Sequence, residues 1–120
     1  SDIKINKNLY PSNLEVKCLG IINHQELLKI YKKSKFMIFP SVRESFGLPL
    51  IEGIQAGCLI IAPKLNYVNE VISPAYSFES NNLKNISKSI LEGVNNKSHP
   101  KQSIKVNNYV DEIFKKLANF

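Results

Sequence analysis

The sequence predicts one α/β domain built on a doubly wound parallel sheet. Short apolar runs alternate along the chain with segments of helical periodicity, and this order is typical of parallel strands joined by right-handed crossover helices. The runs are continuously apolar, as in strands buried on both faces. A chain of 120 residues with 43% hydrophobic side chains is long enough for one core and too short for two ordinary domains.

Four short apolar segments are the predicted strands. The run Val16–Leu19 is closed by Gly20, and the runs over residues 35–39 and 58–62 are each followed by proline. Residues 75–78 form a fourth, shorter strand. Because Cys18 and Cys58 both lie inside these runs, we expect two buried free thiols rather than a disulfide or a zinc site.

Helices are predicted between and after these strands. Asn23 followed by Glu26 begins a helix over residues 23–33, and Pro49 and Gly57 mark the start and the end of a helix over residues 48–57. Residues 67–72 form a short helix and residues 83–94 a longer one. A linker over residues 95–100 leads to a C-terminal helix in 101–120, whose apolar positions are Val106, Val110, Ile113, Phe114 and Leu117.

The net charge of +6 comes from sixteen basic residues, of which only Arg43 is an arginine. They are spread along the chain, so we expect no nucleic-acid partner. A basic surface also suits phosphate-bearing substrates or an anionic membrane. The lysine cluster at 29, 32, 33 and 35 is predicted to be a solvated face, with peripheral membrane contact as the alternative. No apolar run spans a bilayer and no signal core opens the chain, so a cytoplasmic location is expected.

The loop over residues 40–48 follows a predicted strand, at the edge where doubly wound sheets bind ligands. It contains Glu44, and seven residues separate this carboxylate from Glu52 in the next helix. Each carboxylate can accept hydrogen bonds from two hydroxyls, and the amides at Gly47 and Leu48 open a helix N-terminus that favours phosphate. This set suits a molecule with hydroxyls at both ends and a diphosphate between them. Arg43 is expected to be a surface charge.

The run Pro40-Ser-Val-Arg-Glu-Ser-Phe-Gly-Leu-Pro-Leu-Ile-Glu-Gly resembles the E-x7-E signature of retaining glycosyltransferases with two Rossmann-like domains, the GT-B group that includes family 4. The segments 16–20, 55–57 and 69–72 stand in the order this family has, and the resemblance covers residues 16–95. It implies that the chain is a partial, Rossmann-like C-terminal domain. The family's N-terminal acceptor domain and its upstream basic pair are missing, so we expect a truncated piece that is inactive alone.

The resemblance also implies roles for residues of the loop. Glu44, the catalytic residue, would bind hydroxyls of the donor hexose, and Glu52 would hold the ribose. The amides of Phe46, Gly47 and Leu48 would meet the sugar and the distal phosphate, with Ser45 in the same donor site. Ser41 either reaches the donor or ends the preceding strand. No cofactor and no metal are implied, and the only aspartates, at positions 2 and 111, form no Asp-x-Asp motif. The acceptor attacks on the face that the diphosphate leaves, without a protein nucleophile.

The function predicted from these residues is binding of a nucleoside-diphosphate sugar, as the donor half of a hexosyltransferase for bacterial surface polysaccharide or glycolipid. The acceptor, a carbohydrate or a lipid-linked one, would bind the missing domain. The alternative is a non-catalytic nucleotide-binding or regulatory module. A receiver-like signalling domain is excluded because no predicted strand ends in aspartate. His24 and His99 are predicted to be surface histidines, and Glu70 either lines the donor pocket or caps a helix.

Overall fold

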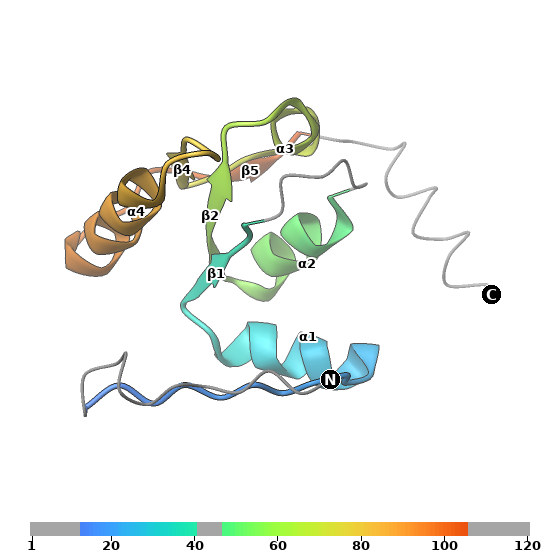
Figure 1. Cartoon of the computed structure of the whole chain (residues 1–120). Coiled ribbons are helices and arrows are strands. Elements are labelled where there is room, and N and C mark those ends of the chain that lie inside the picture. The colour runs from blue at the N-terminus through green and yellow to red at the C-terminus, as the bar shows by residue number, and fades with distance from the viewer. Residues whose placement is uncertain (1–12, 41–46, 106–120) are drawn as a thin grey trace.

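The computed structural model describes residues 13–40 and 47–105, and its helices and strands alternate along the chain (Figure 1). The helices are α1 (His24–Lys33), α2 (Leu48–Ala56), α3 (Asn66–Val71) and α4 (Leu83–Asn95). The strands are β1 (Phe36–Ile38), β2 (Leu59–Pro63), β3 (Ile72–Ser73), β4 (Tyr76–Phe78) and β5 (Ser103–Ile104). This order confirms the predicted α/β class.

A parallel sheet lies at the centre of the molecule, with strand order β1-β2-β4. Met37 of β1 lies opposite Ile60 of β2, and Ile61 of β2 lies opposite Tyr76 of β4. Parallel neighbours need a crossover between them; α2 connects β1 to β2. Figure 1 shows α1 and α2 on one side of the strands and α4 on the other. The sheet is therefore doubly wound, as predicted.

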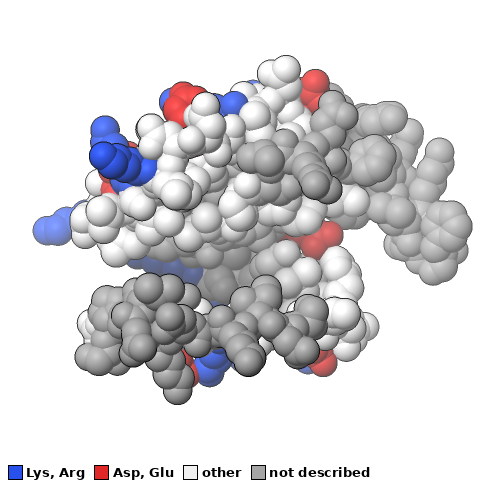
Figure 2. All heavy atoms as spheres, in the orientation of Figure 1, with Lys and Arg blue, Asp and Glu red and all other residues white. Residues whose placement is uncertain are grey.

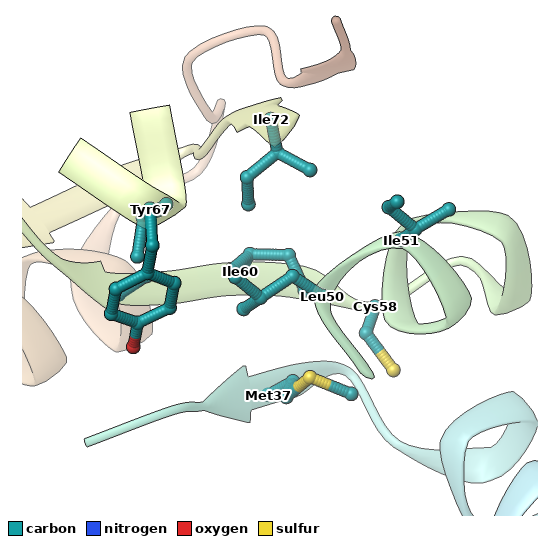
Figure 3. Close-up of a cluster of buried hydrophobic side chains, with 9 residues drawn as sticks. Met37, Leu50, Ile51, Cys58, Ile60, Tyr67 and Ile72 are labelled. Carbon is teal, nitrogen blue, oxygen red and sulfur yellow. The ribbon is translucent and has the colours of Figure 1, made fainter. Parts of the chain in front are cut away.

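Neighbouring residues of β2 build the two halves of the core, because successive side chains of a strand point to opposite faces. Ile60, which is fully buried, packs with Met37 of β1 and Leu50 of α2 in the first cluster (Figure 3). Ile61 belongs to the second cluster, against which Ile86 of α4 packs. The same strand thus holds α2 on one face and α4 on the other.

Side-chain caps and glycine fix the helix boundaries. The side chain of Asn23 accepts a hydrogen bond from the amide of Glu26 at 2.9 Å, which confirms the predicted start of α1. Asn82 caps α4 in the same way. Gly57 ends α2 with a φ of 97°, and its amide donates to the carbonyl of Ile54 at 3.0 Å. A left-handed residue at this position is the usual helix stop.

The strand predicted at Val16–Leu19 is wrong. Residues 13–20 form no strand, and Val16 and Leu19 are 38% and 53% exposed. Among the described residues no strand pairs with this run, so its backbone joins no sheet and its apolar side chains are not covered by a helix. Cys18 is therefore exposed, against the prediction, whereas Cys58 is buried as predicted.

A two-stranded antiparallel sheet, β3 with β5, is absent from the prediction. Ile72 lies opposite Ile104, and the amide of Lys105 donates to the carbonyl of Val71 at 2.9 Å. The helix predicted over 101–120 is thus wrong at residues 103 and 104, because Ile104 packs against the first core cluster as part of a strand. Residues 106–120, which carry the rest of that predicted helix, lie outside the described residues.

The side chain of Gln102 extends the sheet beside β2. The pairing of β2 with β4 begins at Ile61, so the backbone just before it has no β4 partner. The Gln102 amide fills this place: its Oε1 accepts from the amide of Ile60 at 2.9 Å, and its Nε2 donates to the carbonyl of Cys58 at 2.6 Å. One side chain thus satisfies two polar groups of residues that are fully buried.

We expect Gln102→Ala to lower the free energy of unfolding by about 2 kcal/mol, because a buried amide and a buried carbonyl lose their partners. Urea denaturation measures the change. Gln25→Ala, an exposed position on α1, is the matched control and should cost less than about 0.5 kcal/mol. Equal costs at the two positions would show that Gln102 does not hold β2.

Candidate functional site

The carboxyl ends of β1 and β2 lie at one edge of the parallel sheet, where the connections to α2 and α3 begin (Figure 1). Open α/β sheets place ligands at this edge. The site residues predicted from the sequence all belong to the connection from β1 and to the first turns of α2. Of these, Ser41, Glu44, Ser45 and Phe46 lie outside the described residues, as does Arg43, whereas Gly47, Leu48 and Glu52 are described.

Gly47 forms the entry to α2 and adopts a left-handed conformation, with a φ of 68°. A Cβ at this position would lie 2.7 Å from Cγ2 of Val71 in α3, so a side chain there meets both strain and a clash. The first hydrogen bonds of the helix run from the amides of Leu50 and Ile51 to the carbonyl of Gly47. The amide of Leu48 precedes them and remains at the positive end of the helix.

Glu52 lies in the second turn of α2, and its side chain is only 14% exposed. Its Oε1 is 3.8 Å from Nε2 of His24, the first residue of α1. Burial raises the pKa of the Tyr31 phenol, and electrostatic interactions with Glu52 and then with Cys58 raise it further. The carboxylate is therefore held beside two side chains of α1.

Cys58 fixes α1 in this position. Its thiol donates to the carbonyl of Tyr31 at 3.0 Å and lies 3.6 Å from the carbonyl of Ser34. Burial raises the pKa of this thiol, so it stays protonated and keeps the hydrogen bond. The C-terminal turn of α1 is thereby attached to the start of β2, and the helix lies against α2. This packing brings His24 to Glu52.

One of the two histidines agrees with the prediction and the other does not. His24 is exposed, as predicted, with 62% of its side chain accessible, but its pairing with Glu52 is absent from the prediction. His99 is not the surface histidine that was predicted. Its Nδ1 lies 2.7 Å from the hydroxyl of Tyr76, and its ring packs edge-on against Phe36 and Tyr76. The rings of Phe36 and Tyr76, which are distant from His99 in the sequence, hold its imidazole against the sheet.

Charged side chains elsewhere are mostly solvated. Glu70 is exposed on α3, and its predicted place in a donor pocket stays a prediction. The lysines at 29, 32, 33 and 35 are exposed, as predicted for a solvated face. Figure 2 shows basic side chains mainly over the α4 side of the molecule, and no continuous basic stripe on the described surface of that view.

A hollow of about 620 Å³ runs along the outer face of α4. This helix covers the sheet face opposite α2, so the hollow is remote from Glu52. It contains none of the residues predicted for the site. It is lined by Leu83, Lys84, Ser87, Lys88, Leu91, Glu92, Asn95 and Asn96.

Within residues 13–40 and 47–105, no three His, Cys, Asp or Glu side chains lie close enough together to bind a metal ion. None of the helices in this part of the chain has both the length and the apolar composition needed to cross a bilayer.

Known proteins resemble large parts of the chain. It is 29% identical to an uncharacterized glycosyltransferase, MJ1178, of Methanocaldococcus jannaschii over 97 residues, which are 78% of this chain and 28% of that protein. It is 26% identical to the O-antigen chain mannosyltransferase B of Escherichia coli over 84 residues, 69% of this chain and 22% of the relative. The serotype-specific mannosyltransferase WbdA of Escherichia coli is 32% identical over 53 residues, 44% of this chain and 6% of the relative.

The chain thus spans less than a third of the length of these curated relatives. No solved structure matches it. The model of the family "Glycosyl transferases group 1" matches residues 8–109, which include both β1 and the whole of α2. A match over this much of the chain agrees with the doubly wound fold and with the glycine-bearing start of α2. The chain therefore belongs to the group 1 glycosyl transferases.

Proposed function

We propose that the chain binds a nucleoside-diphosphate sugar, as the donor half of a retaining hexosyltransferase. The observation that carries this proposal is the arrangement at the start of α2. A left-handed glycine opens the helix at the carboxyl end of β1, and the largely buried carboxylate of Glu52 follows one turn later. A helix start favours phosphate oxygens, and a carboxylate accepts hydrogen bonds from a pair of hydroxyls.

The parts of the donor are assigned to residues accordingly. The distal phosphate and the sugar lie at the amides of Phe46, Gly47 and Leu48, and the ribose hydroxyls donate to Glu52. Hydroxyls of the hexose donate to Glu44, and Ser41 and Ser45 line the same end. These assignments follow the E-x7-E resemblance, and the glycine-led start of α2 supports the assignment of phosphate.

The proposed reaction relies on orientation and charge rather than on a protein nucleophile. The acceptor hydroxyl attacks the anomeric carbon on the face from which the diphosphate departs, so the configuration is retained. The positive end of α2 stabilises the charge that develops on the leaving diphosphate. We assign no metal ion to this step. Glu44 is the residue that orients the hexose for attack.

Transfer is proposed for the whole protein, because the chain spans less than a third of its curated relatives. The acceptor, a carbohydrate or a lipid-linked one, binds outside this chain. Two relatives are named as mannosyltransferases, one of them for O-antigen chains. We therefore propose a nucleoside-diphosphate mannose as the first donor to test and surface polysaccharide as the product. A lipid-linked acceptor would bring the protein to the cytoplasmic face of a membrane, where exposed lysines meet anionic headgroups.

Calorimetric titration of the chain with uridine, guanosine and adenosine diphosphate sugars tests this function. We expect saturable one-to-one binding of one nucleotide class, with a Kd no weaker than about 1 mM. The same nucleotide as a monophosphate should bind at least about tenfold more weakly, because it lacks the distal phosphate. Absence of binding by all three classes at millimolar concentration would contradict the proposal.

A further inference from the structure

The imidazole of His24 and the carboxylate of Glu52 face each other across a gap. The distance from Nε2 to Oε1 is 3.8 Å, whereas an N–H···O hydrogen bond is about 2.7–3.2 Å long. The two groups are thus within ion-pair distance but too far apart for a direct hydrogen bond. Among the described residues, His24 is the only basic side chain within ion-pair distance of Glu52.

The backbone positions of both groups are fixed. His24 is the first residue of α1, directly after the cap formed by Asn23, and the thiol of Cys58 holds the other end of that helix. Glu52 lies inside α2, between positions that are buried in the core. The carboxylate is 14% exposed and the imidazole 62% exposed. An atom that binds Oε1 on this side must therefore lie against the imidazole.

We propose that His24 and Glu52 hold one ribose hydroxyl of the donor between them. Nε2 and Oε1 are 3.8 Å apart. A hydroxyl oxygen placed about 2.8 Å from both atoms would therefore form an Nε2···O···Oε1 angle of about 85°. The hydroxyl donates to Oε1 of Glu52 and accepts from Nε2–H of His24. The neighbouring hydroxyl of the ribose donates to the second carboxylate oxygen. This inference rests on the proposed function and adds His24 to the site.

Protonation of His24 does not decide whether this contact forms. The neutral tautomer with its proton on Nε2 and the imidazolium both donate from Nε2. The contact instead selects for the hydroxyl itself, because a site built to bond a hydroxyl discriminates against an analogue that lacks it. His24 is therefore a specificity residue for a ribonucleotide over a deoxyribonucleotide.

A cycle of variants and ligands tests this contact. The chain, His24→Leu and His24→Gln are titrated with the nucleotide sugar that binds and with its 2′-deoxy and 3′-deoxy forms. We expect His24→Leu to weaken the ribonucleotide about fivefold and to leave one of the two deoxynucleotides unchanged. His24→Gln keeps an N–H at similar reach and should retain the affinity within about twofold. Unchanged thermal midpoints of both variants serve as the folding control.

Two results would overturn the inference. Equal weakening of the ribonucleotide and both deoxynucleotides by His24→Leu would mean that the imidazole acts through charge or packing alone. Unchanged affinity for all ligands would mean that the pair with Glu52 is only an ion pair at the surface. Either result leaves the proposed function standing, provided that Glu52→Gln still weakens binding. If the unaltered chain binds no nucleotide, the proposed function fails and this inference fails with it.

Discussion

Glu52→Gln is expected to weaken binding of the nucleotide sugar about 100-fold while the fold stays intact. In the proposed site the carboxylate accepts from both ribose hydroxyls, whereas an amide would present one acceptor and one donor to the same pair. Hydrogen bonds to a charged group contribute about 1.5–3 kcal/mol each. A loss of roughly 3 kcal/mol corresponds to about 100-fold in Kd. Calorimetric titration of the variant measures this change.

The matched control for this charge change is Glu92→Gln. Glu92 is exposed on α4, which covers the opposite face of the sheet. The control variant should bind within about twofold of the unaltered chain, because a distant surface charge is screened by salt. If Glu52→Gln behaves like the control, Glu52 does not hold the ribose.

Gly47→Ala should lower the free energy of unfolding by about 3 kcal/mol. The left-handed conformation, with a φ of 68°, costs an L-residue about 1–2 kcal/mol. The new Cβ would also lie 2.7 Å from Cγ2 of Val71, so α3 or the start of α2 must shift, and such overpacking adds about 1–3 kcal/mol. Urea denaturation measures the loss, and the displaced helix start should weaken nucleotide binding as well.

Gly57→Ala separates the two contributions. Gly57 also has a positive φ, 97°, but a Cβ there would meet no atom within 4 Å. Its substitution should therefore cost only the conformational strain, about 1–2 kcal/mol. In a Val71→Ala background the added cost of Gly47→Ala should fall toward this value. Equal losses for both glycines in the unaltered background would show that the contact with Val71 is unimportant.

The sequence predicted the features that depend on local chemistry. Asn23 begins α1 and Gly57 ends α2 because each satisfies or redirects nearby backbone groups. The continuous apolar run that contains Ile60 became the central strand of a parallel sheet. Gly47 was singled out by its place before a proline-led helix, and the structure shows its left-handed conformation.

Features that depend on distant partners escaped the prediction. Val16–Leu19 has the composition of a buried strand, yet composition cannot supply a neighbouring strand. The strands β3 and β5 have two residues each, too few for a periodic pattern. Gln102 serves β2 through its side chain, and no local pattern marks such a role.

The candidate site likewise has one residue that local sequence predicts and one that depends on a distant partner. Glu52 follows from its spacing in the motif and from its helix, whereas the place of His24 beside it follows from the packing of α1 on α2. The two residues are 28 positions apart in the sequence. The Cys58 thiol that holds α1 was predicted only as a buried side chain, because its hydrogen bond to Tyr31 again joins distant segments.

Amide chemical-shift mapping by NMR tests most directly whether the start of α2 binds the nucleotide sugar. On titration with the nucleotide sugar that binds, we expect the largest shifts at the amides of Leu48, Glu52 and His24. The amides along the outer face of α4, including Ser87 and Leu91, should stay unchanged. Shifts confined to the hollow along α4, with none at the start of α2, would show that the nucleotide sugar does not bind at this helix start.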